Sequence, residues 1–145
     1  MDIRRITDAA DVLAAGELFD DAPAPEWTQR FLDRAGHHLL LAYSDGIAVG
    51  MVTGIELLHP DKGVEMILYE LGVLPDYRRR GIASALIDRL AALARTAGCY
   101  DMWVLIEKEN DAARLTYLSA GGEYDGETLF VWDFGTATDA GATSD

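Results

Sequence analysis

The sequence predicts an α+β fold in which a mixed, mainly antiparallel sheet is flanked by helices. Three apolar runs, 38–43, 47–58 and 64–74, are separated by short turns, which is the pattern of an antiparallel meander. An amphipathic helical pattern follows over 79–97, and a further apolar run over 102–106 comes after it. Parallel strands need a crossover connection of this kind, so we expect the last run to lie parallel to the third.

Length and composition point to one domain. A chain of 145 residues suits a single domain, expected over 1–134, and the small, polar and acidic residues 135–145 are expected to form a flexible tail. No apolar run approaches the roughly 18 residues of a membrane span, and the first residues lack the apolar core of a signal peptide. Cys99 is the single cysteine, so no internal disulfide is possible and we expect a cytoplasmic protein.

The charge balance narrows the range of partners. Lysines and arginines number 12 against 25 aspartates and glutamates, which gives a formal net charge of −13. Such acidity argues against binding to nucleic acid or to an anionic membrane. It favours a small cationic molecule or a basic peptide, although solubility alone also accounts for an acidic surface.

N-cap residues and prolines predict the boundaries of the N-terminal strand and helices. Residues 2–6 have the pattern of a short strand, and Thr7 and Asp8 are N-cap residue types ahead of a helix over 9–19. A stretch with two prolines ends that helix, and a second helix is expected over 25–34.

The middle of the chain predicts close packing between a strand and a helix. Gly50 and Gly54 interrupt the strand 47–58 and predict a bulge or a close approach of another backbone. Apolar residues recur every three or four positions over 79–97, so one face of this helix is expected to pack on the sheet.

The C-terminal third contains one more helix and a hairpin. Asn110 is a good N-cap for a helix over 110–118, and two glycines end that helix. Residues 123–125 and 128–134 have the pattern of a final hairpin.

A basic turn between the third strand and the long helix suits a phosphate. Arg78, Arg79 and Arg80 precede Gly81, and the helix begins close to them. The first N–H groups of a helix lack intrahelical partners, and the helix dipole places positive charge there. Because the helix dipole is positive at this end, arginines are unfavourable here unless an anion binds. Their presence favours an anion site over the alternative, a solvated basic surface.

Two segments resemble the motifs of one superfamily. Residues 78–83, Arg-Arg-Arg-Gly-Ile-Ala, fit its R/Q-x-x-G-x-G/A turn, and residues 110–117 resemble its N-x-x-A-x-x-x-Y helix. By these motifs and their context, the chain is similar over 39–134 to the GCN5-related N-acetyltransferases, the GNAT superfamily. The resemblance implies acetyl-CoA as co-substrate, a parallel strand pair that splays apart to bind it, and direct acetyl transfer to an amine.

The resemblance also implies which residues contact acetyl-CoA. The basic turn and the start of the helix would hold its pyrophosphate. Backbone groups on either side of Gly72, where the family has a strand bulge, would bond the pantetheine amides as an added strand does, whether or not their side chains also belong to the core. The residues expected at the cofactor are Leu71, Val73, Arg78, Arg79, Arg80, Gly81, Ile82, Ala83, Ser84, Asn110 and Tyr117.

Acetyl transfer needs a neutral amine and a proton for the leaving thiolate. Tyr117 matches the family's tyrosine near the cofactor sulfur and is expected to be the general acid; the alternative is an aromatic residue at the edge of the core. Glu70 is an acid in an apolar strand and is expected to be the general base or to bind a cationic amine, because burial raises a carboxyl pKa. In the alternative, Glu70 points to solvent. Weaker candidates for the base are Glu56, Glu65 and Glu107.

Metal chemistry is not expected. A zinc site needs three or four convergent ligands, and His37, His38, His59 and Cys99 lack such spacing. Cys99 has the character of a small buried hydrophobic residue rather than of a nucleophile.

Within the superfamily, the chain looks most like the gentamicin-type aminoglycoside 3-N-acetyltransferases. The likeness rests on residues 69–73, Tyr-Glu-Leu-Gly-Val, on the turn after them and on a Trp-Asp-Phe near the end of the chain. It implies an aminoglycoside or another small cationic amine as acceptor. Asp20, Asp21 and Glu26 would then either meet the amine or serve as ordinary loop and helix-start acids.

Two other functions stay open. One is a protein or peptide N-acetyltransferase, and the other is a non-catalytic module that binds acyl-CoA. Many relatives dimerise through their C-terminal strands, so residues 128–134 are a candidate homodimer interface by analogy.

Overall fold

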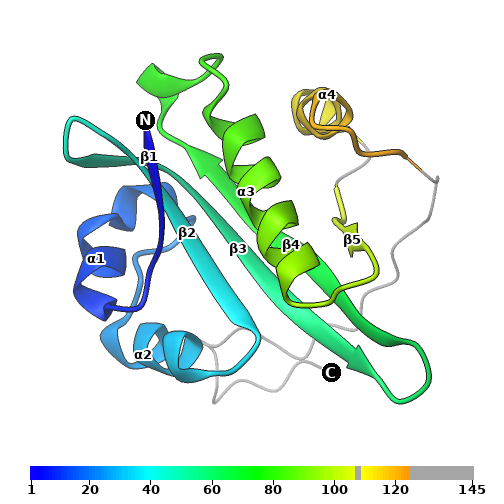
Figure 1. The fold of residues 1–145 in the computed structure, drawn as a ribbon. Helices are drawn as coiled ribbons and strands as arrows, with labels where there is room; N and C mark the ends of the chain where they lie inside the picture. Colours follow the sequence, from blue (N-terminus) through cyan, green and yellow to red (C-terminus); the bar gives the residue numbers. More distant parts are fainter. Residues whose placement is uncertain (107–108, 125–145) are drawn as a thin grey trace, which may run out of the picture.

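A five-stranded sheet organises the computed structural model, which describes residues 1–106 and 109–124 (Figure 1). The strands lie in the order in which they occur along the chain, with the first four antiparallel and the last parallel to the fourth. The predicted fold class, a mixed and mainly antiparallel sheet with flanking helices, is confirmed. The strands are β1 Asp2–Arg5, β2 His37–Ser44, β3 Ile47–His59, β4 Gly63–Val73 and β5 Met102–Trp103.

Helices cover both faces of the sheet. Helix α1, Ala9–Ala14, and helix α2, Pro25–Asp33, lie on one face together with the 3-10 turn η1, Gly16–Leu18. Helix α3, Ile82–Thr96, crosses the other face, and helix α4, Asp111–Ser119, lies beside it (Figure 1). No helix among the described residues is both long and apolar enough to span a membrane.

The first helix is shorter than predicted. Asp8 caps α1 by accepting a hydrogen bond from the N–H of Ala10 at 2.9 Å, as expected for this residue type. The helix ends at Ala14, because the N–H of Ala15 already bonds the carbonyl of Val12 three residues back and the chain then tightens into η1. Gly16 follows directly, and glycine is a weak helix former.

Two apolar clusters form the core, one on each face. The cluster under α3 is made of Leu40, Ala42, Val49, Val52, Met66, Leu68, Ile82, Leu86, Ile87, Leu90 and Ala94. The cluster under α1, η1 and α2 is smaller and is made of Ile6, Val12, Ala15, Leu18, Leu39, Leu41 and Met51.

Gly50 and Gly54 let α3 lie close to β3. A Cβ atom at Gly50 would meet Ile82 Cγ2 at 2.8 Å, and one at Gly54 would meet Leu90 Cδ1 at 2.6 Å. Both distances are shorter than a real Cβ contact. The sequence predicted a bulge or a close approach of another backbone; the atoms nearest to both Cβ positions are instead side-chain atoms of the helix, and the strand pairing shifts register between Val52 and Gly54.

The start of α3 was predicted three residues too early. The helix begins at Ile82 rather than at Arg79, because Arg79 and Gly81 both have left-handed backbone conformations, with φ of 61° and 81°. The strand expected over 102–106 is paired only at Met102 and Trp103. The hairpin strand 128–134 and the tail 135–145 lie outside the described residues.

Candidate active site

The pairing of β3 with β4 contains an irregularity close to Glu70. Val52 pairs with Leu71 and Gly54 with Leu68, so Thr53 alone faces both Tyr69 and Glu70. The hydroxyl of Thr53 accepts a hydrogen bond from the N–H of Glu70 at 3.0 Å. This bulge was predicted at residues 71–73. It lies earlier because Thr53 supplies an acceptor for the extra N–H.

The bulge reverses which backbone groups point to which neighbour. Before it, the N–H of Met66 donates to the carbonyl of Asp101, next to β5, at 3.0 Å. After it, the N–H of Leu74 donates to the carbonyl of Val49 on β3 at 2.9 Å. In a regular strand, the N–H groups of alternate residues point to the same side, so the N–H groups of Met66 and Leu74 would both point toward β5. Past the bulge, therefore, Leu71 and Val73 present their N–H and carbonyl groups to the side away from β3.

That side of β4 is open beyond the short pairing with β5. Met66 and Ile67 pair with Met102 and Trp103, and among residues 1–106 and 109–124 no strand pairs with β4 on this side past Ile67. Figure 1 shows β5 stopping well before the end of β4. We call the β5-facing edge of β4 from Leu68 to Val73 the open edge. An extended ligand with amide groups can pair with it as a strand would.

The N-terminus of α3 is uncapped and close in sequence to the open edge. Gly81 is the N-cap and provides no capping side chain. The N–H of Ala85 bonds the carbonyl of Gly81 at 3.0 Å, so the N–H groups of Ile82, Ala83 and Ser84 precede the first helical hydrogen bond. No acid lies in the first turn, and a Cβ at Gly81 would have no atom within 4 Å. The geometry leaves room for an anion here.

The three arginines before this helix are all exposed but differ in their contacts. Arg78 Nε donates to the carbonyl of Val73 at 3.1 Å and so ties the turn to the end of β4. The guanidinium of Arg80 lies 5.1 Å from the ring centroid of Tyr77. Arg79 holds the left-handed backbone conformation of the turn. Sequence alone did not distinguish them.

Glu70 is half-buried and faces the α1 and α2 side of the sheet. It lies at a pocket of ≈ 170 Å³, which we call the α2 pocket. Burial raises the pKa of Glu70, and the negative charge of Asp20 raises it further. Glu70 therefore points into a pocket and is only partly exposed to solvent. The described residues that line the α2 pocket are Val12, Phe19, Pro23, Ala24, Trp27, Thr28, Phe31, Leu39, Thr53 and Glu70.

Sequence reasoning missed most of the pocket wall. Its residues come from α1, α2, the loop between them and three strands, and no local motif links them. One signal was present: Thr53 is a polar residue inside the apolar run of β3, and it is 2% exposed. Of the three acids expected near an amine, Asp20 acts on Glu70 electrostatically, whereas Asp21 and Glu26 are exposed residues outside the pocket lining.

Asn110 and Tyr117 lie on α4. The side chain of Asn110 accepts a hydrogen bond from the N–H of Ala113 at 3.1 Å, which confirms its role as N-cap. Tyr117 is half-buried and packs against the α3-side cluster, as Leu71 and Val73 do. Burial raises the pKa of Tyr117, so its hydroxyl keeps its proton at neutral pH.

The other glutamates proposed as bases have structural partners. Glu56 Oε2 lies 2.6 Å from His38 Nε2, and Arg5 Nε donates to the other ring nitrogen at 3.1 Å. Because Arg5 occupies Nδ1 as a donor, Nε2 carries the proton that bonds Glu56. Glu65 Oε2 lies 2.5 Å from His59 Nε2. The remaining candidate, Glu107, lies outside the described residues.

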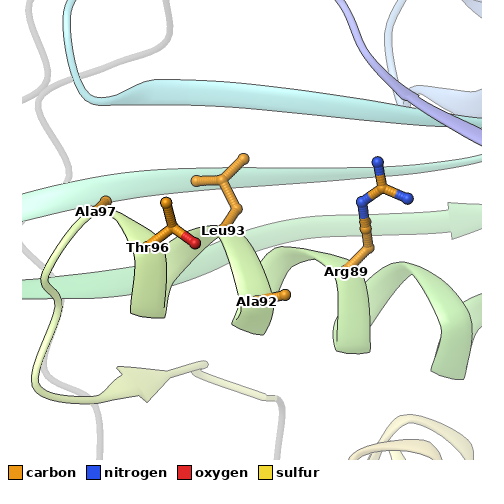
Figure 2. A pocket seen from close by; sticks show the side chains of 5 residues that line it. All are labelled: Arg89, Ala92, Leu93, Thr96 and Ala97. Atoms are coloured by element: carbon orange, nitrogen blue, oxygen red, sulfur yellow. The ribbon is translucent and has the colours of Figure 1, made fainter.

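A second hollow, of ≈ 360 Å³, lies on α3 and is larger than the α2 pocket. Figure 2 shows Arg89, Ala92, Leu93, Thr96 and Ala97, which line it and come from successive turns of this one helix. The lining contains no carboxylate or imidazole that can accept a proton from an amine. Size alone therefore does not identify the site, and the α2 pocket is the better candidate.

Comparisons with known proteins match this geometry. A model described as the acetyltransferase (GNAT) family matches residues 3–121. An acetyltransferase of Yersinia pestis (strain Pestoides F) is 37% identical over 84 residues, which cover 58% of this chain and 56% of the relative. The chain thus aligns with only about half the length of that relative. The ribosomal protein bS18-alanine N-acetyltransferase of Salmonella typhimurium is 28% identical over 120 residues, which cover 80% of this chain and 77% of the relative.

Solved structures share the fold. An aminoglycoside acetyltransferase from an uncultured soil metagenomic sample, in complex with sisomicin, has a TM-score of 0.83 at 20% identity, covering 91% of this chain and 94% of that one. AAC(6')-Iy, in complex with a bisubstrate analog of CoA, has a TM-score of 0.80 at 22% identity, covering 91% and 97%. A 6'-N-acetyltransferase of Acinetobacter haemolyticus is similar too, so these structures do not single out the 3-N branch.

The family model extends over most of the chain, from β1 to the end of α4, and includes both motifs that predicted it. The chain therefore belongs to the acetyltransferase (GNAT) family.

Proposed function

We propose that this protein transfers the acetyl group of acetyl-CoA directly to the primary amine of a small cationic molecule. One observation carries the proposal. The bulge lets β4 serve both the cofactor and the acceptor. It turns the backbone groups of Leu71 and Val73 to the open edge, and it places Glu70 in a pocket on one face of the sheet.

The cofactor side of the proposal uses backbone groups. Leu71 and Val73 would pair with the pantetheine amides along the open edge, as an added strand does. The uncapped N–H groups of Ile82, Ala83 and Ser84 would bind the pyrophosphate, with Gly81 leaving room for its approach. Arg78, Arg79 and Arg80 would add positive charge, and Asn110 would contact the cofactor from α4. Acetyl-CoA supplies an activated acyl group as a thioester.

The acceptor side uses two titratable groups. Glu70 would take the proton from the ammonium or the attacking amine, and its raised pKa makes it a better base than an exposed glutamate. Tyr117 would give its proton to the leaving thiolate, since burial keeps the hydroxyl protonated at neutral pH. We expect Tyr117→Phe to lower kcat far more than it weakens acetyl-CoA binding. Equal losses of kcat and affinity would make the hydroxyl a binding group.

The identity of the amine is the open part of the proposal. An aminoglycoside is supported by the fold neighbours, one of which was crystallised with sisomicin, and the 3-N branch is supported by residues 69–73. A peptide N-terminus is supported by the relative that acetylates an alanine of a ribosomal protein. A binding module without turnover would bind acetyl-CoA and release no thiol with any amine.

The test is thiol release from acetyl-CoA with a panel of amines, combined with one charge insertion. Gly81→Glu adds a carboxylate at the proposed pyrophosphate site. Two like charges about 4 Å apart repel by about 4 kcal/mol near a protein surface, so the Kd for acetyl-CoA should rise by about a thousandfold. Gly98→Glu is the matched control, because Gly98 follows the other end of α3, also has positive φ, 86°, and also has no atom within 4 Å of its Cβ position.

Equal effects of the two substitutions would mean that the N-terminus of α3 is not the anion site, and the cofactor side of the proposal would fail. Calorimetry with acetyl-CoA and with desulfo-CoA measures this affinity without turnover.

A further inference from the structure

We infer that the acceptor carries one apolar group, an aromatic ring or a branched alkyl chain, next to its primary amine, and that it is not a polycation. The inference rests on the proposed acetyl transfer and adds the substrate class. Its basis is the chemistry, size and charge of the α2 pocket.

The pocket is apolar except at one place. Seven of its lining residues have hydrocarbon or aromatic side chains: Val12, Phe19, Pro23, Ala24, Trp27, Phe31 and Leu39. Two are threonines, and Glu70 is the single titratable side chain among the described residues that line it. An amine bound at Glu70 therefore has apolar side chains around the atoms next to its nitrogen. Such surroundings favour an apolar substituent, and Glu70 is the one carboxylate that the described lining offers to an ammonium group.

The volume suits a substituent of one ring or one branched chain. The pocket measures ≈ 170 Å³ and is open to solvent on one side. An engineered apolar cavity of about 150 Å³ is known to hold benzene, so one ring fits within this pocket. Further rings of a larger molecule would lie in the open part of the pocket, where they bury less apolar surface.

The charges around the pocket place the ammonium group at one end. Asp20 and Glu70 lie close enough for the charge of Asp20 to raise the pKa of Glu70, so both attract a cation to the same end. The guanidinium of Arg30 lies 4.7 Å from the ring centroid of Trp27, a residue of the pocket wall that is 55% exposed. This positive charge repels a second ammonium group at that wall.

Two sources offer the same chemistry. One is a free arylalkyl or branched alkyl amine, and the other is a peptide whose first residue has such a side chain. In both, the apolar group lies within a few bonds of the primary amine.

The experiment compares kcat/KM for five acceptors. Phenethylamine and isoamylamine carry one apolar group, a tetrapeptide amide that begins with phenylalanine tests the second source, and spermidine and gentamicin are polycations. Because burial of one such group contributes to binding, kcat/KM for phenethylamine should exceed that for either polycation by about tenfold to a hundredfold. A higher value for the peptide than for phenethylamine would assign the peptide source and keep the inference.

A variant that fills the pocket sharpens the test. Ala24 lines the α2 pocket but is exposed, so Ala24→Phe narrows the pocket with little disturbance of the core. It should lower kcat/KM for phenethylamine about tenfold, lower that for methylamine much less, and leave the Kd for acetyl-CoA unchanged. Ala92→Phe is the matched control, because Ala92 is an exposed alanine at the hollow on α3 (Figure 2).

The outcomes separate this inference from the proposed function. Turnover of gentamicin or spermidine at or above that of phenethylamine overturns the inference and keeps acetyl transfer. A second outcome is that phenethylamine binds in calorimetry in the presence of CoA, that Ala24→Phe abolishes this binding, and that no amine is turned over. This outcome supports the apolar pocket and overturns the proposed function. If phenethylamine neither binds nor reacts, the inference is wrong.

Discussion

On the α3 face of the sheet, side chains fill the space so closely that two glycines of β3 are needed for the helix to fit. On the α1 and α2 face, a helix of six residues and a single 3-10 turn leave the α2 pocket, with Glu70 at its wall. The α3 face has no comparable carboxylate in its cluster. The closely packed face holds the strands in place, and the incompletely packed face contains the pocket that we propose as the acceptor site.

This difference explains why one strand can serve both purposes. Leu68 and Leu71 of β4 both pack in the α3-side cluster. In a regular strand, alternate residues share a face, so two residues three positions apart would point to opposite faces. The bulge between them absorbs the extra residue, and Glu70 is left free to project to the other face.

The largest effect is expected from the charge in the α2 pocket. Glu70→Gln keeps the size of the side chain but removes the base, and loss of a positioned base lowers kcat by about 10² to 10⁴. Thiol release at saturating amine measures this. Glu56→Gln is the control, because Glu56 is bonded to His38 and is not part of the pocket. If both variants lose the same activity, the α2 face is not the catalytic one.

A smaller effect is expected from adding one methyl group to each face. A Cβ at Gly72 would lie 2.8 Å from the carbonyl oxygen of Leu18, whereas at Gly54 it meets the ends of the flexible Leu90 and Met66 side chains. Overpacking costs about 1–3 kcal/mol, and we expect Gly72→Ala at the upper end of that range and Gly54→Ala at the lower.

The two alanine variants should also differ in kinetics. Gly72→Ala displaces the backbone of Leu18, which is adjacent in sequence to Phe19 of the pocket wall, so KM for the amine should rise; Gly54→Ala should leave KM unchanged. Urea unfolding gives the stabilities, and the amine titration gives KM. A change in KM with Gly54→Ala alone would reverse the roles that we assign to the two faces.

The smallest effect concerns pH. Burial and the charge of Asp20 raise the pKa of Glu70 above its ordinary value of 4.5, so the folded state binds this proton more tightly than the unfolded chain. Its contribution to stability is therefore present below the unfolded pKa and is lost as the pH rises through the folded pKa. Glu70→Gln should have a higher Tm than the wild type at neutral pH, and the gap should close below pH 4.5. A gap that widens in acid would contradict the burial of Glu70.

Local features of the fold were predictable from sequence. The meander of β2, β3 and β4, the apolar stripe of α3 and the cap at Asn110 depend on residues close in sequence, and the structure confirms them. The left-handed backbone of Arg79 was not predictable, because arginine has no preference for that conformation and the turn as a whole imposes it.

For the proposed site, the sequence indicated a strand and two motifs. Glu70 was chosen as a candidate because an acid is unusual in an apolar strand, and its role stays a prediction. The exact place of the bulge depends on Thr53 across the sheet, and the pocket wall depends on how α1 and α2 pack. These are contacts between distant parts of the chain, and no spacing in the sequence encodes them.

The bulge at Tyr69 and Glu70 has a consequence for how this strand can vary in length. Losing one residue there would restore a regular ladder with the pair Val52 and Leu71 intact, so the later part of β4 would keep its pairing with β3 and its open edge. A deletion after Leu71 would instead shift every following side chain to the opposite face. Among related chains, gaps within β4 are therefore expected to fall at this bulge, where the loss of Tyr69 would keep the projecting carboxylate and the loss of Glu70 would remove it.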